Sequence, residues 1–425
     1  MILDRKIAPA ILPVNDAVPQ EPKSANLANG IQIFSLSAGS QDVLKIELVF
    51  DINFDVANNS LIPSFTSSLI KAGTSKLNAH QIAEAVDDYG AFFETDIDKD
   101  HASITIYTLS RYLNETLPVI SMILDDSIFP ERELEIKRAK RIQQYKVSLG
   151  KVGFVASKRF QELLFDGTPY ASKYDESTFS EISRDQLVSF YNVYFKQAPF
   201  KVFVSGKLDD SIVERVSQEF ASRTVVKNGP FKFSPSVDAI RHHPEFIEKP
   251  EAVQSAIRIG RRMFNRNHPD YFGIKILSTV LGGYFGSRLM SNIREDKGYT
   301  YGIGAGIVPL LNSGYFYVST EVGADVCSKA IVEIYKEMQL LCDVEVEQPE
   351  LDLVRSYMLG AILKNFEGPF ERMERFKTVH FDGFDLSFFK SYTNAIRTIS
   401  PAELKALANK WLKPEFMTEL IVGKK

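Results

Sequence analysis

The chain contains an internal repeat at one constant spacing, and this repeat is the feature that most constrains its fold. When residues 133–207 are shifted by 217 positions, they fall on residues 350–424 with a recurring pattern of charged and apolar side chains. Ser183, for example, falls on Ser400. The spacing is far longer than the roughly 20–50 residues of solenoid and propeller repeats. It therefore predicts two copies of one fold, each large enough to have its own core.

The composition between the two copies predicts where one ends and the other begins. Residues 224–250 are rich in proline and contain a Gly-Pro pair, which is typical of a linker. We therefore expect an N-terminal domain at 1–223 and a C-terminal domain at 251–425. Strands are grouped with helices without strict alternation, which predicts an α+β fold. Each domain would be a mostly antiparallel sheet backed by helices.

Local patterns predict the elements of each copy, whereas residues 1–30 carry none and are expected to form an arm or loop. In the first copy we expect strands at 31–36, 43–50, 91–97, 102–109 and 200–204, and helices at 61–72, 79–89, 112–126, 130–149 and 184–195. In the second we expect strands at 252–261, 299–307, 314–320 and 418–422, and helices at 269–281, 286–296, 325–341, 348–364 and 401–412.

Charge and composition exclude two classes of partner. The net charge of −4 and the pI near 6.0 argue against nucleic acid, which requires a basic face. No uncharged run of about 18 apolar residues is present, so no membrane span is expected. The two cysteines, Cys327 and Cys342, predict no disulfide framework and favour a reducing compartment. The first residues do not resemble a signal peptide, so we expect a cytoplasmic protein, with the periplasm as the open alternative.

The helix expected at 61–72 raises the question of chemistry. Ser64 and Ser68 are four residues apart and share one helix face, and the helix is followed by Gly73-Thr74. Taken alone, this favours an ordinary face of small residues. Together with the order of the surrounding elements and its repetition, however, it resembles the pitrilysin/insulinase family of zinc peptidases. The resemblance covers nearly the whole chain and implies one half of a clamshell.

In that family the first helix carries His-x-x-Glu-His, and a more distal Glu completes the zinc site. By the resemblance, the two histidines fall on Ser64 and Ser68, and the catalytic base falls on Ser67. The distal ligand falls on Gln144, with Gln143 as the alternative. Hydroxyl and amide groups replace all four, so we expect no metal site, no cofactor and no catalytic residue in this chain.

Other candidate sites are weaker. The six histidines include no pair four residues apart on which zinc could bind. His242-His243 is interpreted as a surface pair in the linker, and His101 as exposed polarity at a strand turn. The family's substrate-binding edge strand, an Asn-Ala-aromatic-Thr sequence, is replaced here by residues 94–97. The first copy is therefore expected to have lost its substrate edge as well as its metal.

The second copy retains what the family uses opposite the zinc. The segment at 282–301 resembles the family's Arg/Tyr segment, in which an Arg and a Tyr seven residues later hold the substrate carbonyl and stabilise the oxyanion. The resemblance places this substrate-binding pair at Arg294 and Tyr301. Tyr299 is the alternative phenol, and Arg288 is expected to support packing or a salt bridge. Without the resemblance, Arg294 would be a solvated helix-end residue and Tyr301 a strand-packing residue.

The loss of zinc ligands together with the retained pair predicts a division of labour. The leading hypothesis is a non-catalytic subunit of a heterodimeric zinc peptidase. Its partner of the same family would bear the zinc, and peptide substrates would occupy the shared cavity. The alternative is a peptidase-derived scaffold or peptide-binding protein with no part in catalysis. A peptidase that uses other ligands is the least favoured interpretation.

Overall fold

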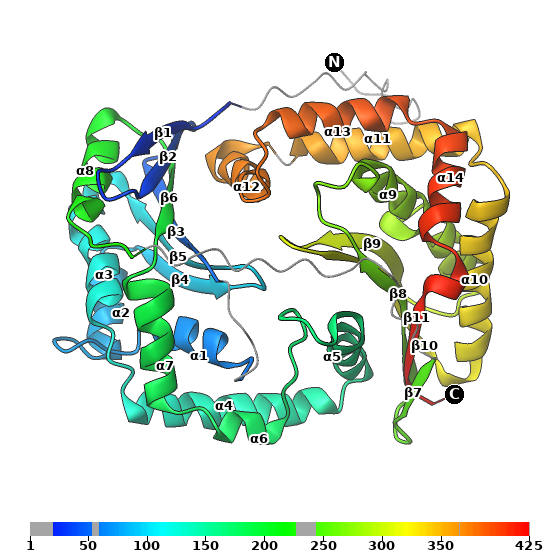
Figure 1. The fold of residues 1–425 in the computed structure, drawn as a ribbon, viewed down its shortest axis with the longest axis horizontal. Helices are drawn as coiled ribbons and strands as arrows, with labels where there is room; N and C mark the ends of the chain where they lie inside the picture. The colour runs from blue at the N-terminus through cyan, green and yellow to red at the C-terminus, as the bar shows by residue number, and fades with distance from the viewer. Residues whose placement is uncertain (1–19, 53–58, 227–243, 365, 425) are drawn as a thin grey trace, which may run out of the picture.

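The first half of the chain forms a six-stranded sheet. The computed structural model describes residues 20–52, 59–226, 244–364 and 366–424 (Figure 1). The strands follow the order β1-β2-β6-β3-β5-β4, in which β2 and β6 are parallel and the other pairs antiparallel. Their bounds are β1 Lys23–Asn26, β2 Gln32–Ser37, β3 Val43–Asp51, β4 Phe92–Ile97, β5 His101–Leu109 and β6 Phe200–Gly206.

The first half also forms helices, some of which contact β4 and β5. A capping box begins α2, because the Asn78 side chain accepts from the Gln81 backbone N–H and the Gln81 side chain accepts from the Asn78 N–H. The helix bounds are α1 Ile62–Leu69, α2 Ala79–Asp87, α3 Leu113–Asp126, α4 Glu131–Leu149, α5 Val152–Phe165, α6 Glu176–Ser180, α7 Arg184–Tyr191 and α8 Asp210–Ala221.

The second half forms a five-stranded sheet in the order β7-β11-β8-β10-β9, with only β7 and β11 parallel. The strand bounds are β7 Glu245–Glu248, β8 Gln254–Met263, β9 Ile303–Pro309, β10 Gly314–Gly323 and β11 Thr418–Gly423. The helix bounds are α9 Tyr271–Ser278, α10 Cys327–Asp343, α11 Gln348–Lys364, α12 Gly368–His380, α13 Ser387–Thr398 and α14 Pro401–Trp411. Two π-helical segments, η4 Thr279–Gly283 and η5 Met290–Asp296, follow α9.

The two sheets have one topology, as the repeat predicts. Strands β2, β6, β3, β5 and β4 correspond in order and direction to β7, β11, β8, β10 and β9. The first residues of α4 and α11, and those of α7 and α14, lie at the predicted spacing of 217. Ser183 and Ser400 both begin their helices with a capping box. The predicted α+β fold of two mostly antiparallel sheets with helices is confirmed.

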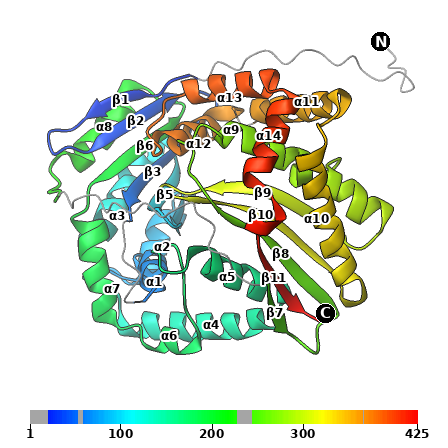
Figure 2. The same cartoon turned by 45° about the vertical axis from the view of Figure 1, so that its right-hand side comes forward.

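One helix of each half packs on the sheet of the other half. Helix α5 lies against β8 and β11, and α12 lies against β2 and β6 (Figures 1 and 2). The Phe376 ring of α12 stands 5.1 Å from Phe34 in β2, and Phe160 of α5 shares a buried cluster with Leu420 in β11. The predicted domain boundaries remain a prediction. We call this arrangement of α5 and α12 the helix exchange. Through it, each half completes the core of the other.

Several local expectations need correction. The segment 1–30 contains β1, which pairs with β2, and the expected linker contains β7. The strand expected at 299–307 begins only at Ile303, so Tyr299 and Tyr301 precede it. Helices α5, α6, α8, α12 and α13 are additional to those expected. The His242-His243 pair lies outside the described residues.

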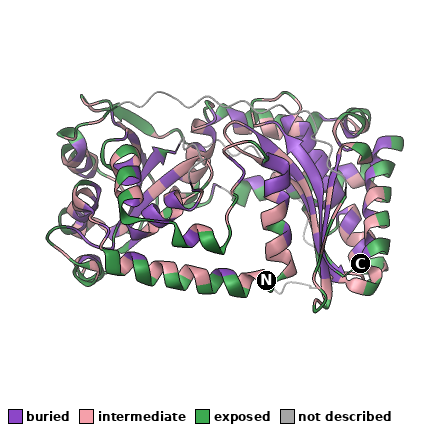
Figure 3. Cartoon of the chain, turned by 60° about the horizontal axis from the view of Figure 1, so that its bottom comes forward, coloured by how far each residue is buried: buried purple, intermediate pink, exposed green. Residues whose placement is uncertain are grey.

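Burial follows the layers of the fold. Strands β8 and β11 are buried over most of their length, β9 and β10 alternate between buried and more exposed residues, and the outward faces of the helices are exposed (Figure 3). In the part of the chain that the structure describes, no helix is both long and apolar enough to cross a membrane.

Candidate functional site

Helix α1 holds the positions where the resemblance places the zinc ligands. Ser64 Oγ donates to the Leu61 carbonyl at 3.0 Å, and Ser68 Oγ donates to the Phe65 carbonyl at the same distance. These hydroxyls thus bond to the preceding turn of their own helix. Ser67 is buried. Gln144 on α4 is exposed.

This set of side chains does not fit a zinc ion. Zinc is bound by thiolate, imidazole or carboxylate groups, and the α1 positions offer hydroxyls that already donate to carbonyls. Within residues 20–52, 59–226, 244–364 and 366–424, no three His, Cys, Asp or Glu side chains are placed to hold a metal. No chemical step in this chain can therefore be derived through a metal at α1.

The edge strand beside α1 is attached to that helix. Strand β4 ends the first sheet and carries the residues 94–97 that replace the family's substrate edge. Lys71 Nζ donates to the Phe93 carbonyl at 3.3 Å, and Thr95 Oγ1 donates to the Ser67 carbonyl at 3.0 Å. Polar side chains thus join β4 to α1 and to Lys71, which lies just after the helix.

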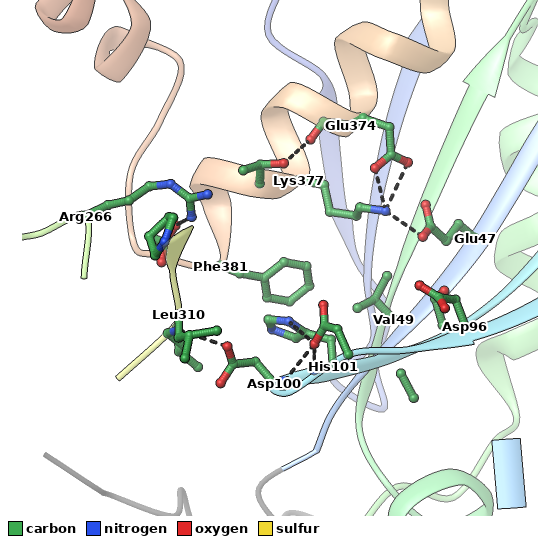
Figure 4. A pocket seen from close by; sticks show the side chains of 17 residues that line it. Glu47, Val49, Asp96, Asp100, His101, Arg266, Leu310, Glu374, Lys377 and Phe381 are labelled. Carbon is green, nitrogen blue, oxygen red and sulfur yellow. Dashed lines mark hydrogen bonds and ion pairs between the residues drawn. The ribbon is translucent and has the colours of Figure 1, made fainter. Parts of the chain in front are cut away.

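A cavity of about 340 Å³ lies between the two halves (Figure 4). Strands β3 to β5 of the first half form one wall, and α12 and the β9–β10 turn of the second half form the others. Six of its lining residues are acidic: Glu47, Asp96, Asp98, Asp100, Glu374 and Asp382. The cavity exists only because α12 crosses onto the first sheet.

Two glutamates and two lysines form a network in one wall of this cavity. Lys377 Nζ of α12 lies 2.5 Å from Glu47 Oε1 and 2.9 Å from Glu374 Oε2. Lys45 Nζ lies 2.5 Å from Glu374 Oε1 and 3.1 Å from Glu47 Oε2. Burial alone would raise the pKa of Glu374, but Lys377 and Lys45 outweigh it and lower this pKa to about 2. The Glu374 carboxylate is therefore charged, and the network joins β3 to α12.

The tips of two hairpins meet at the other side of the cavity. Tyr170 Oη donates to Asp100 Oδ1 at 2.6 Å, and the Leu311 backbone N–H donates to Asp100 Oδ2 at 2.9 Å. The Asn312 N–H in turn donates to Tyr170 Oη at 3.1 Å. Burial raises the pKa of Asp100. These bonds join the β4–β5 turn to the β9–β10 turn.

His101 belongs to this wall and is not the exposed residue that we expected. Its ring lies 4.2 Å from that of Phe381, and its Nε2 lies 3.6 Å from Asp51 Oδ1. Nearby, Arg266 pairs with Asp382. Four carboxylates of the cavity thus have partners. Glu47, Glu374 and Asp382 pair with cations, and Asp100 accepts hydrogen bonds at the hairpin tips. They join the halves and are not arranged as a catalytic acid and base.

The structure places the predicted pair on the second half. Arg294 lies on η5, with its guanidinium carbon 4.4 Å from the centre of the Phe285 ring and Nη1 3.9 Å from Glu295 Oε1. Tyr301 precedes β9 and is 95% exposed. Tyr299 is partly buried and packs against the core of the second half. Of the two phenols, Tyr301 is the one open to solvent.

Arg288 has the structural role that we expected. Its Nε and Nη2 donate to the two carboxylate oxygens of Glu350 on α11, both at 2.8 Å. A bidentate pair of this kind fixes geometry as well as adding energy. Arg288 thus attaches the segment before η5 to α11. The roles of Arg294 and Tyr301 stay predictions.

Comparisons with known proteins agree with the resemblance. Residues 181–358 match the family model described as Peptidase M16 inactive domain. An uncharacterized zinc protease of Rickettsia bellii is 23% identical over 338 residues, covering 78% of this chain and 81% of the relative. A protein of Helicobacter pylori named non-peptidase homolog YmxG is 21% identical over 365 residues, covering 84% of this chain and 83% of the relative.

Solved structures show the same fold. The peptidase M16 inactive domain from Pseudomonas fluorescens superposes with a TM-score of 0.84 at 20% identity, covering 95% of this chain and 98% of the other. The predicted likeness to zinc-motif-lacking M16 peptidases is thus confirmed. The matched family model and the name of the H. pylori relative support a chain that is not a peptidase by itself.

Proposed function

We propose that this chain is the non-catalytic subunit of a heterodimeric peptidase. It is similar to M16 peptidases, but the residues of its own α1 do not fit zinc. It assembles with a zinc-bearing subunit of the same family. Arg294 and Tyr301 then act on the peptide that the partner hydrolyses. The zinc and the nucleophilic water belong to the partner.

The observation that carries this proposal is the exposure of Tyr301. A tyrosine ring that is 95% exposed buries almost no apolar surface and adds little to the stability of its own chain. Tyrosine and arginine are the residues that most often anchor an interface, because they combine a large apolar body with a polar end. A nearly free phenol close in sequence to Arg294 therefore favours contact with another molecule.

The chemistry of the pair suits peptide hydrolysis. When a carbonyl is attacked, its oxygen gains negative charge, and donors fixed around that position stabilise the transition state. The guanidinium supplies a permanent charge, and the phenol supplies a neutral donor. Arg294 rests on the Phe285 face, and among the described residues Glu295, at 3.9 Å, is its one acidic neighbour. Its charge is thus only weakly compensated within its own chain.

The test is reconstitution with a partner of the same family that bears His-x-x-Glu-His. Tyr301→Phe removes only the hydroxyl and is expected to lower kcat about 10²–10³-fold, the usual cost of one oxyanion donor. Assembly, measured by analytical ultracentrifugation, should be unchanged. Arg294→Lys should also lower kcat, because an ammonium cannot reproduce the guanidinium fork.

Tyr357→Phe on α11 is the matched control, since Tyr357 is a 46% exposed tyrosine outside the pair. Its activity should stay at the unmodified level. Full activity of both pair variants in an intact heterodimer would reject the proposal. The chain would then be better described as a scaffold.

A further inference from the structure

Four cationic side chains gather where α4 passes α1. Lys137 and Arg141 are four residues apart on α4 and share the helix face of Gln144, three residues further on. Arg141 lies 5.7 Å from the centre of the Phe65 ring on α1. Lys140 is next to Arg141 in the sequence. Lys71 lies just after the C-terminal end of α1, the helix that carries Ser64 and Ser68. We call these four residues the α1–α4 cation cluster.

Nothing in the described residues neutralises this charge on α4. No described carboxylate forms an ion pair with Lys137, Lys140 or Arg141, whereas Lys146 on the same helix pairs with Glu176 at 2.8 Å. Lys137 is half-buried, and burial lowers its pKa, as do the neighbouring charges of the cluster. Like charges that are held together and partly desolvated disfavour the folded state.

The equivalent helix of the second half shows that the fold does not require these charges. At the spacing of 217, Lys137 and Arg141 correspond to Val354 and Met358 on α11, which are 0% and 5% exposed. The same helix face is therefore apolar and packed in one copy, and cationic and uncompensated in the other. A cost borne in only one copy points to a ligand that offsets it.

The position of the cluster indicates the class of ligand. It adjoins the edge strand β4, where Lys71 Nζ already donates to the Phe93 carbonyl. An edge strand can pair with an extended peptide backbone. A carboxylate fits a site made of one guanidinium and several ammonium groups.

We propose that the α1–α4 cation cluster binds a carboxylate of a peptide, either an acidic side chain or the C-terminal carboxylate. That the carboxylate belongs to a peptide rests on the proposed function. Helix α1, which binds zinc in the family that this chain resembles, would here help to bind a peptide carboxylate. The first half would then take part in holding the substrate.

Binding to the isolated full-length chain tests this. Three fluorescein-labelled ten-residue peptides are compared by anisotropy: one with a central Asp and an amidated C-terminus, one with Asn and an amidated C-terminus, and one with Asn and a free carboxylate. We expect at least one carboxylate-bearing peptide to bind about tenfold more tightly than the neutral peptide. The difference should shrink in about 0.5 M sodium chloride, because salt screens partly exposed charges.

The decisive variant is the double change Lys137→Met and Arg141→Met, which brings in unbranched apolar side chains like the one at Met358. It should abolish the preference for carboxylate while unfolding stays cooperative. Lys146→Met on the same helix is the control and should leave the preference intact. Equal binding of all three peptides, no binding of any, or the same loss in the control would overturn the proposal.

Inorganic phosphate serves as a competitor. Displacement of the Asp peptide by millimolar phosphate, without displacement by an equal ionic strength of chloride, would identify a phosphate site and reject carboxylate as the ligand. The binding measurements contain no partner subunit. A negative result in them would therefore reject the carboxylate site, whereas loss of the effect of Arg294 and Tyr301 in the reconstituted peptidase would reject the proposed function.

Discussion

The two halves share one topology but, at one equivalent place in the two sheets, contact each other's helix by different chemistry. Glu47 in β3 lies opposite Phe203 in β6, and Arg258 in β8 lies opposite Leu420 in β11. Phe203 and Leu420 are 217 residues apart, so Glu47 and Arg258 occupy equivalent places. The Glu47 carboxylate pairs with Lys377 of α12.

Arg258 instead donates to neutral groups of α5, to Ser157 Oγ at 3.2 Å and to the Gly153 carbonyl at 3.4 Å. The difference shows that the fold requires a polar link at this place but not a particular charge. It also predicts that, at this place, the contact of α12 with the first sheet responds to charge and pH more strongly than the contact of α5 with the second.

The largest expected effect is that of Glu47→Leu. This change leaves Lys45 and Lys377 partly buried with Glu374 as their remaining partner in the network. Breaking one side of a buried pair typically costs about 3–5 kcal/mol of unfolding free energy. Urea unfolding followed by circular dichroism measures it. The double change Glu47→Leu with Lys377→Met removes charges of both signs and should cost less; a larger loss would contradict the network.

The matching change in the other half is Arg258→Met, with a smaller expected cost. The groups left without Arg258 are neutral, and an unsatisfied neutral acceptor costs about 1–3 kcal/mol. Urea unfolding under identical conditions compares the two variants directly. If Arg258→Met proved the more damaging, the proposed ranking of the two interfaces would be wrong.

Acid should weaken the α12 interface through His380. Burial lowers its pKa from 6.5 to about 4, and Lys201 adds to this. A depressed folded pKa means that the neutral ring stabilises the fold above about pH 6.5 and that this is lost as the pH falls towards 4. We expect a loss of about 2 kcal/mol over that window, allowing for partial solvent exposure.

His380→Leu isolates this effect, because the equivalent residue of α5 is the buried Leu163. The variant should unfold with a flatter dependence on pH between 6.5 and 4, the limits set by the shift of His380. If the unfolding free energy of the variant and of the unmodified chain depended equally on pH, His380 would not be the cause of the acid sensitivity. A second loss of stability, towards pH 2, is expected from Glu374, whose folded pKa is depressed from 4.5 to about 2.

The smallest effects should come from the former zinc positions. Ser64→Ala and Ser68→Ala remove hydroxyls that donate only to carbonyls of their own helix, so each should change stability by no more than about 0.5 kcal/mol. Peptidase activity of the reconstituted heterodimer should be unchanged. Stoichiometric zinc in the isolated chain by elemental analysis, lost in either variant, would show that α1 still binds metal.

Local signals were enough to predict the repeat and most of the elements. The helices beginning at Glu131 and Gln348 follow from nearby residues alone. Helices α5 and α12 were missed because the sheets on which they pack are formed by residues far away in the sequence. Their apolar side chains therefore gave no clear local pattern.

The site was only partly predictable for the same reason. The family resemblance points to Arg294 and Tyr301, whose roles stay predictions, and it does not indicate that Arg294 rests on Phe285. The ionic wall of the cavity was not predicted. Its sequence signal was present in β3, where Lys45 and Glu47 interrupt a run of buried apolar residues. Two opposite charges inside such a strand indicate a partner across the sheet face, although the sequence does not name it.

The helix exchange also has a consequence for synthesis of the chain. The face of the first sheet that carries Phe34 and Phe203 stays uncovered until α12 has been made, more than 150 residues after β6 ends. At about 5–20 residues per second, the wait is on the order of 10–30 s. A nascent chain arrested before Gly368 should therefore expose these rings to chaperones and proteases, although every strand of the first sheet has already been translated.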